Sequence, residues 1–124
     1  MSEQIHELDA ANHGAKLKLD GNSAPEIRQM MQELADFRRQ KGWDESNLKD
    51  LAIALMGETN EVLDIFKWQP ENQPLSDHDL AHLEEELADV QIYVYDMCLG
   101  LGLDPLKLVQ AKHQINQGRT WPEA

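Results

Sequence analysis

Two pairs of acidic residues lie in segments where a helix would be expected to bury apolar side chains. Glu58 and Glu61 occur in GETNEVLDIFKW, and Glu86 and Asp89 occur in LEEELADVQIYVYDM. A carboxylate that faces a helix-packing surface needs a partner, because burying an unpaired charge is costly. Four carboxylates on two facing helices need a cation between them, and Mg²⁺ takes oxygen ligands. The residues therefore predict a metal site and suggest a metal-dependent enzyme.

The helical period places the four acids at matching positions on their two helices. Successive residues advance by about 100° around a helix. On that scale Glu58 falls within the apolar stripe of its segment, and Glu61 falls on the edge, roughly 60° away. Glu86 and Asp89 repeat this layout with the same offset of roughly 60°. A single pair of this kind is usually a solvated face or a salt-bridge pattern, but two matching pairs favour a shared site.

A di-iron carboxylate bundle is the alternative metal site, and it uses Glu-x-x-His motifs that face inward. The second member of each motif here is Glu61 or Asp89, and neither acidic motif contains a histidine. An all-oxygen ligand set favours Mg²⁺ or Mn²⁺ over iron or zinc. The chain has five histidines, among them His78, His82 and His113. We interpret all five as surface or packing residues.

The elements that position these acids are predicted to be helices. Ser23-Ala24-Pro25-Glu26 matches a capping box with proline in the first turn, and apolar residues follow at helical spacing. Gly42 is expected to end this first helix. Three further helices are predicted, from Ser46 or Asn47 to about Trp68, from Ser76 or Asp77 to about Leu99, and from Pro105 to about Asn116.

Glycines and caps mark the remaining boundaries. Gly100 and Gly102 are expected to end the third helix, Asp104 to cap the fourth, and Gly118 to close it. No segment shows the alternation of a strand. The chain is therefore predicted to be all-α, with four helices arranged like a bundle over residues 23–124. Residues 1–22 are predicted to form a polar arm, either loosely ordered or packed on a neighbouring subunit.

Composition limits the class of protein further. The 124 residues suit one domain, and 23 Asp and Glu against 11 Lys and Arg give a formal net charge of -12. This charge argues against a nucleic-acid partner, and it would repel a nucleotide triphosphate unless local cations or a metal intervened. The single Cys98 is expected to be a packed, unreactive thiol in a reducing cytosol. The chain has no apolar run of membrane-spanning length and no signal-peptide core, so we expect a cytoplasmic protein without a membrane partner.

The acidic segments, together with their flanks, resemble the MazG-like, all-α nucleoside triphosphate pyrophosphohydrolases. FRRQKGWDESNLKDLAIAL precedes the first acidic motif, and KHQINQGRTWP stands near the end of the chain. The resemblance covers about residues 25–122 and leaves the arm uncovered. The FKW ending of the first motif and the compact length are most similar to the small dCTP pyrophosphatase branch.

The resemblance implies a fold, an assembly and a reaction. It implies an all-α MazG fold that assembles as a homodimer or a dimer of dimers, with active sites near subunit interfaces. The implied activity is hydrolysis of NTPs or dNTPs to the monophosphate and pyrophosphate with Mg²⁺, or alternatively Mn²⁺, as nucleotide-pool house-cleaning. By motif, Glu58, Glu61, Glu86 and Asp89 are the metal ligands. Glu61 is our candidate for orienting or deprotonating the attacking water.

Basic residues near the C-terminus are candidates for contacts to the triphosphate. Lys112 and Asn116 share one helix face, and Arg119 lies just past the helix end. A cation, an amide and a guanidinium suit phosphate oxygens. The alternative is a solvated helix end with a favourable dipole interaction. Arg38, Arg39 and Lys41, near the end of the first predicted helix, are interpreted as solvated rather than catalytic, although one of them could reach a phosphate.

Aromatic residues are candidates for contacts to the base. Trp43, Trp68 and Tyr93 could sandwich it, although Trp and Tyr are also ordinary core residues. Leu34 stands where the dCTP-type relatives have a polar base-sensing residue, so cytosine selectivity is not a firm expectation. Asn60 departs from the small residue that many relatives have in the first motif. Other functions compatible with the sequence are an acidic helical adaptor without enzymatic activity, and the same fold acting on phosphoribosyl-ATP or dUTP.

Overall fold

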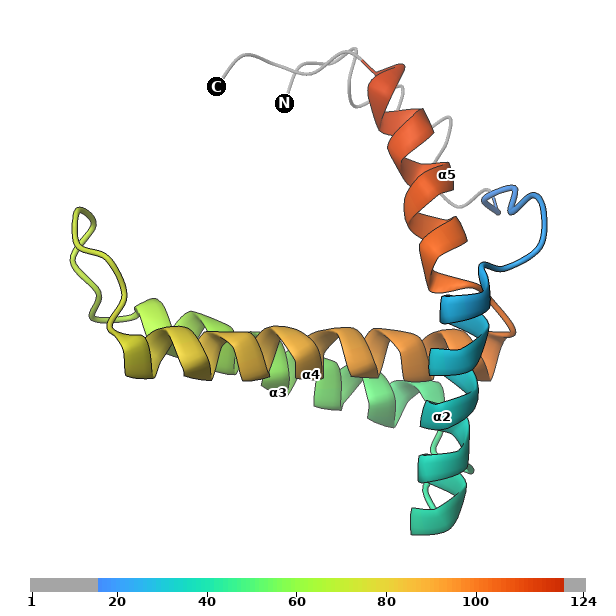
Figure 1. Cartoon of the computed structure of the whole chain (residues 1–124), viewed down its shortest axis with the longest axis horizontal. Coiled ribbons are helices and arrows are strands. Elements are labelled where there is room, and N and C mark those ends of the chain that lie inside the picture. The colour runs from blue at the N-terminus through green and yellow to red at the C-terminus, as the bar shows by residue number, and fades with distance from the viewer. Residues whose placement is uncertain (1–15, 120–124) are drawn as a thin grey trace.

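The computed structural model describes residues 16–119. This part of the chain holds no strand, so the predicted all-α class is confirmed. Residues 1–15, which make up most of the predicted arm, lie outside the described residues, and so does the TWP end of the C-terminal pattern. The helices of the described part are α2 (Pro25–Lys41), α3 (Leu48–Phe66), α4 (Asp77–Leu101) and α5 (Pro105–Gln117) (Figure 1).

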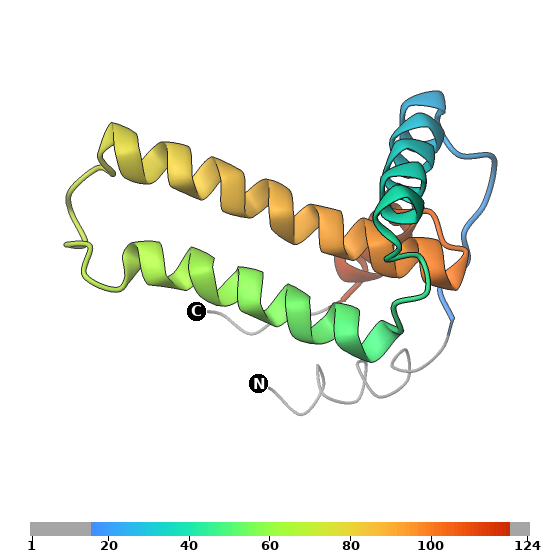
Figure 2. The same ribbon diagram turned by 90° about the horizontal axis from the view of Figure 1, so that it is seen from below.

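Helices α3 and α4 form an antiparallel hairpin that is the centre of the fold. They lie side by side in both views and make the most extensive helix–helix contact of the described chain (Figures 1 and 2). Local caps fix where each begins. The side chain of Asn47 accepts a hydrogen bond from the Asp50 amide at 2.8 Å, and Ser76 accepts one from the Asp79 amide at 3.1 Å. Both caps were predicted, and the two helices carry the acidic motifs.

Helix α2 crosses α4 near the C-terminal end of α4 (Figure 1). The capping box predicted at its start is wrong, because the N-cap residue is Ala24 and no side chain caps the helix. Proline disfavours a helical conformation in the residue before it, so Pro25 begins the helix and Ala24, not Ser23, precedes it. The predicted stop is confirmed, since Gly42 adopts the left-handed conformation with φ 74°.

The connection between α4 and α5 differs slightly from expectation. Gly100 lies inside α4, and Gly102 alone terminates the helix, with φ 68°. A Cβ on Gly100 would lie 3.4 Å from a methyl group of Leu48, so the glycine gives room for the start of α3 beside α4. Asp104 caps α5 as predicted, accepting hydrogen bonds from the amides of Leu106 and Lys107.

The buried core of the described chain is small. Its buried hydrophobic residues are Leu51 and Cys98, and two acidic residues, Glu86 and Asp96, are also buried. Burial raises the pKa of the Cys98 thiol, with a further contribution from Asp104, which agrees with the expected unreactive cysteine. Many large apolar side chains on α3 and α4 remain exposed. Within residues 16–119, no helix is both long and apolar enough to cross a membrane.

Candidate metal centre and adjoining pocket

Glu86 is the buried carboxylate at the centre of the α3–α4 hairpin. Only 6% of the residue is exposed. His82, one turn earlier on α4, lies against it, with 3.3 Å between His82 Nε2 and Glu86 Oε1. The other carboxylate oxygen, Oε2, is buried and has no hydrogen-bond partner among the described residues. A buried oxygen without a partner is costly, so this position favours a further ligand.

The four predicted acids converge on this point from two helices. Glu58, Glu86 and Asp89 each offer one oxygen, and these oxygens lie within 4.8 Å of one another. Glu61, His82 and Glu86 form a second group under the same limit. Glu86 therefore joins two groups of potential metal ligands. The α3–α4 hairpin therefore brings together the four acidic residues of the two sequence motifs.

His82, interpreted from the sequence as a surface or packing residue, is exposed, and its imidazole also lies against Glu86. His82 precedes Glu86 by four residues, so the two side chains lie one above the other on the same helix face. This four-residue spacing is the sequence signal that could have predicted the contact.

The crowded carboxylates raise the proton affinity of Glu86. Its pKa rises from an ordinary 4.5 to about 7, chiefly because the carboxyl group of Glu58 lies beside it, then because of burial and the charge of Glu61. Like charges held this close repel one another unless a proton or a cation lies between them. The oxygen-rich donor set and the unpartnered Glu86 Oε2 therefore fit a divalent cation, and these residues could bind one.

A cavity of about 430 Å³ opens beside the acidic cluster. Its walls come from α2, α3 and α4, and both Glu58 and Asp89 line it. Trp43 and Tyr93, two of the three aromatic residues predicted to contact a base, line the same cavity, as does Leu34. An apolar, partly aromatic hollow with a few charged groups at one side is the usual form of a small-molecule site.

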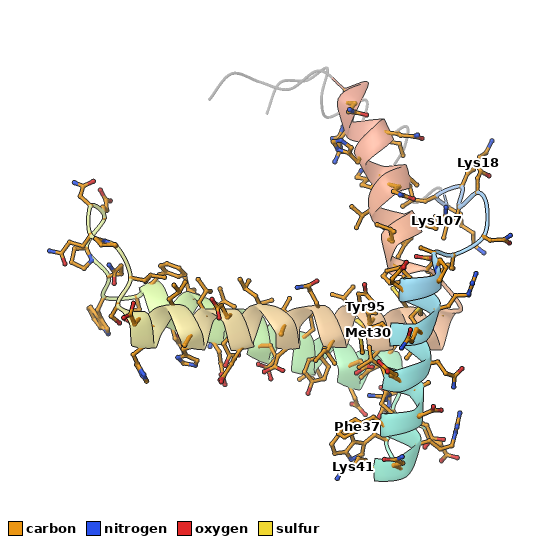
Figure 3. All side chains as sticks on the ribbon, viewed as in Figure 1. Lys18, Met30, Phe37, Lys41, Tyr95 and Lys107 are labelled. Carbon is orange, nitrogen blue, oxygen red and sulfur yellow. The ribbon has the colours of Figure 1, made fainter. Side chains whose placement is uncertain are left out.

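The turn after α2 sets the position of Trp43 in this wall. Because Gly42 is left-handed, the Trp43 amide turns back to donate a hydrogen bond to the Arg38 carbonyl at 2.8 Å. The Trp43 ring then packs edge-on against Phe37, with ring centroids 5.8 Å apart. Phe37 lies near the C-terminal end of α2, where the chain turns towards α3 (Figure 3). The glycine stop predicted from sequence thus positions Trp43, which lines the cavity.

Arg38 and Asp96 form a buried ion pair in the floor of the cavity. Arg38 Nη1 lies 3.2 Å from Asp96 Oδ2, and the two side chains are only 11% and 5% exposed. Arg38 also donates to the Trp43 carbonyl. Burial raises the pKa of Asp96, although the Arg38 charge acts in the opposite direction. The interpretation of Arg38 as solvated is therefore wrong, because its position depends on a helix contact that the sequence pattern does not reveal.

The sequence is similar to those of dCTP pyrophosphatases. No known family profile matches the chain. The chain is 28% identical over 103 residues to dCTP pyrophosphatase 1 of Bos taurus and 29% identical over 100 residues to the Homo sapiens protein. The expected resemblance to dCTP pyrophosphatases is confirmed. The matches cover 79% and 77% of this chain but only 61% and 59% of the relatives, so the chain spans about three fifths of their length. A MazG-like chain is consistent with these dCTP pyrophosphatase relatives.

The other predicted substrate contacts lie away from this cavity in the single chain. Trp68 follows the end of α3 and is 86% exposed. Lys112 and Asn116 border a separate shallow hollow on α5. Arg119 Nη1 lies 3.3 Å from Asn116 Oδ1, which connects the predicted amide and guanidinium. Figure 1 shows α5 directed away from the α3–α4 hairpin. One copy of the described chain therefore brings the acids and two aromatic residues together, but not these four.

Proposed function

We propose that this protein hydrolyses nucleoside or deoxynucleoside triphosphates to the monophosphate and pyrophosphate, with Mg²⁺ at the acidic cluster. The observation that carries the proposal is that one cavity is lined by Trp43 and Tyr93 and by two of the acidic residues, Glu58 and Asp89. A base could therefore stack in the cavity while the phosphates reach the acids. Similarity to proteins named dCTP pyrophosphatase supports the same reaction.

The net charge explains why a cation is needed in this proposal. A chain of formal charge -12 repels a triphosphate, and the phosphates would approach a cluster that is itself acidic. Mg²⁺, when bound, would neutralise the phosphate oxygens and lower the pKa of a coordinated water. Glu58, Glu86 and Asp89 would hold the ion, since their oxygens lie within 4.8 Å of one another.

Glu61 is the proposed residue for orienting the attacking water and accepting its proton. It belongs to the cluster but is exposed, whereas Glu86 is buried and Glu58 and Asp89 are half-buried. An exposed carboxylate beside the ligands can reach a water molecule without losing its own hydration. The water would attack the α-phosphorus, and pyrophosphate would leave.

The cavity wall bears on the choice of base. Trp43 and Tyr93 offer stacking surfaces that accept any base, because every base has an aromatic face. Leu34 lines the same cavity and cannot donate or accept a hydrogen bond at a base edge. We therefore propose that dCTP and other dNTPs, including modified ones, are substrates and that discrimination between bases is modest.

We also propose that the protein acts as a homodimer or a dimer of dimers. The exposed apolar side chains of α3 and α4 provide a surface that a second copy would cover. Trp68, Lys112, Asn116 and Arg119 lie away from the cavity of their own chain. Their proposed contacts to base and phosphates therefore depend on a second copy.

Hydrolysis assays with a panel of nucleotides test this function. The panel contains NTPs, dNTPs, 5-methyl-dCTP, dUTP and phosphoribosyl-ATP with Mg²⁺, and the products are separated by chromatography. We expect monophosphate and pyrophosphate. Glu61→Gln is expected to lower the rate by at least about 100-fold, as for removal of a catalytic acid–base group, and Asp89→Asn is expected to lower it because it removes a ligand of the proposed Mg²⁺. Glu85→Gln and Asp64→Asn are matched controls, because these acids lie outside the cluster.

Two outcomes would overturn the proposal. Release of diphosphate and orthophosphate would show that a different bond is cleaved. No turnover of any nucleotide, with Mg²⁺ binding unchanged in the cluster variants, would favour the adaptor without enzymatic activity.

A further inference from the structure

His82 gives the acidic cluster a donor that an Mg²⁺ site does not require. Its Nε2 lies 3.3 Å from Glu86 Oε1. One donor atom from each of Glu61, His82 and Glu86 lies within 4.8 Å of the others, and this group does not include Glu58 or Asp89. The cluster thus contains two sets of donors that share one carboxylate. One set is entirely oxygen, and the other combines an imidazole nitrogen with two carboxylates.

The buried carboxylate between the two sets indicates that a ligand belongs here. Glu86 has a side chain only 8% exposed, and its Oε2 has no hydrogen-bond partner in the described chain. An ordinary helix-surface pair of His and Glu would leave both side chains hydrated and would need no further group. A carboxylate with one oxygen beside an imidazole and the other oxygen unpartnered can serve two cations at once.

We propose that Glu61, His82 and Glu86 form a second cation position, which prefers a first-row transition-metal dication such as Mn²⁺, Co²⁺ or Zn²⁺ to Mg²⁺. Imidazole suits transition metals, whereas Mg²⁺ favours oxygen donors, so the two sets select different ions. His82 and Glu61 are both exposed, so this position opens to solvent and has room for water or phosphate oxygens.

This inference deepens the proposed function by assigning a metal class to part of the same cluster, and it rests on that function only through the shared residues. Binding of the metal alone is therefore the right test, because it does not depend on nucleotide turnover. A chain that binds Co²⁺ through His82 but hydrolyses no nucleotide would refute the proposed reaction and leave this site intact.

Metal titrations of the full chain test the site, with Co²⁺ and Mg²⁺ as separate probes in calorimetry. Removing even an outer partner of a metal ligand lowers affinity roughly 10–100-fold. We therefore expect His82→Ala to lower Co²⁺ affinity by at least about tenfold, with a much smaller effect on Mg²⁺. His78→Ala is the matched control, because His78 is exposed on the same helix and belongs to neither group.

A spectroscopic signature separates coordination from a structural effect. With Mn²⁺ bound to the full chain, electron spin-echo spectra are expected to show coupling to a directly bound imidazole nitrogen, and His82→Ala is expected to remove it. The inference is overturned if His82→Ala binds Co²⁺ like the wild type. It is equally overturned if His78→Ala loses as much affinity, or if the nitrogen coupling survives the His82 substitution.

Discussion

Glu86 combines burial with two neighbouring carboxylates, and this combination makes its charge depend on pH. The pKa of Glu86 is 4.5 ordinarily and about 7 in the folded chain. At a pH between these two values, the folded chain binds a proton that the unfolded chain has released. Stability falls with rising pH wherever the folded state binds more protons. The contribution of protonated Glu86 is therefore complete below its unfolded pKa and is lost as the pH rises through about 7.

The substitution Glu86→Gln makes this dependence measurable. Glutamine is neutral at every pH, so in a chelating buffer the variant is expected to melt at a higher temperature than the wild type at about pH 8 and to differ much less at about pH 5. Thermal unfolding by circular dichroism at a series of pH values gives the comparison. Glu85→Gln, at the exposed neighbouring position, serves as the control. A melting difference that stays constant across the series would contradict the raised pKa.

At the scale of helices, local signals predicted most boundaries, whereas contacts between residues distant in the sequence could not be predicted from them. Asn47 and Ser76 cap their helices as expected, because a cap is a hydrogen bond over three residues. The shared helix face of each acidic pair was also predictable, because it depends only on the three-residue spacing within the pair. Arg38 was not predictable, because its burial depends on Asp96, 58 residues away.

The Arg38–Asp96 pair is expected to hold α2 against α4. Arg38→Leu removes the ion-pair partner of a carboxylate whose side chain is 5% exposed, and breaking a buried pair this way destabilises a fold by about 3–5 kcal/mol. Urea unfolding measures the change in the free energy of unfolding. Arg39→Leu is the matched control, because Arg39 pairs with Asp36 on the surface and should change stability by at most about 1 kcal/mol.

A double substitution distinguishes the ion pair from simple packing. Arg38→Leu combined with Asp96→Leu removes both charges, so it is expected to recover part of the stability lost in the single variant. If Arg38→Leu is as mild as Arg39→Leu, the pair does not hold the two helices together.

At the scale of the whole molecule, α3 and α4 carry many large apolar side chains that remain exposed in the described part of the chain. Ile53, Met56 and Leu63 lie on the face of α3 opposite its buried Leu51, and they are 61%, 72% and 64% exposed. A second stripe follows α4 at every seventh residue. Its members, all exposed, are Leu80, Leu87, Val94 and Leu101. A seven-residue apolar repeat is the spacing by which one helix packs along another.

The periodicity around the acids could be predicted from sequence, but the extent of this uncovered surface could not. The predicted apolar stripe beside the acids covered one face of each helix and left residues such as Ile53, Met56 and Leu63 outside it. In the structure α3 and α4 contact each other and also carry exposed apolar side chains, because two helices with few neighbours cannot cover each other on all sides. Helices α2 and α5 both lie at one end of the hairpin (Figures 1 and 2), and the side chains of these stripes are exposed.

Self-association through the α4 stripe leads to a prediction that also bears on the reaction. Light scattering coupled to size-exclusion chromatography is expected to give a dimer or tetramer for the full chain, and Leu87→Glu is expected to lower the measured mass. The new charge would have to be buried in the interface without a partner. Ala88→Glu is the control, because it adds the same charge at an exposed position about 100° around the helix.

Hydrolysis measured on the same samples relates assembly to function. Trp68, Lys112, Asn116 and Arg119 lie away from the cavity of their own chain, so the substrate contacts proposed for them require a second copy. Leu87→Glu is then expected to lower the rate of hydrolysis to the same extent as it lowers the fraction of assembled protein. The acidic cluster and the cavity wall formed by Trp43 would stay intact within each chain. A wild-type chain that is monomeric at assay concentrations and fully active would refute the role of a second copy. The site would then have to bind its substrate with the residues of one chain.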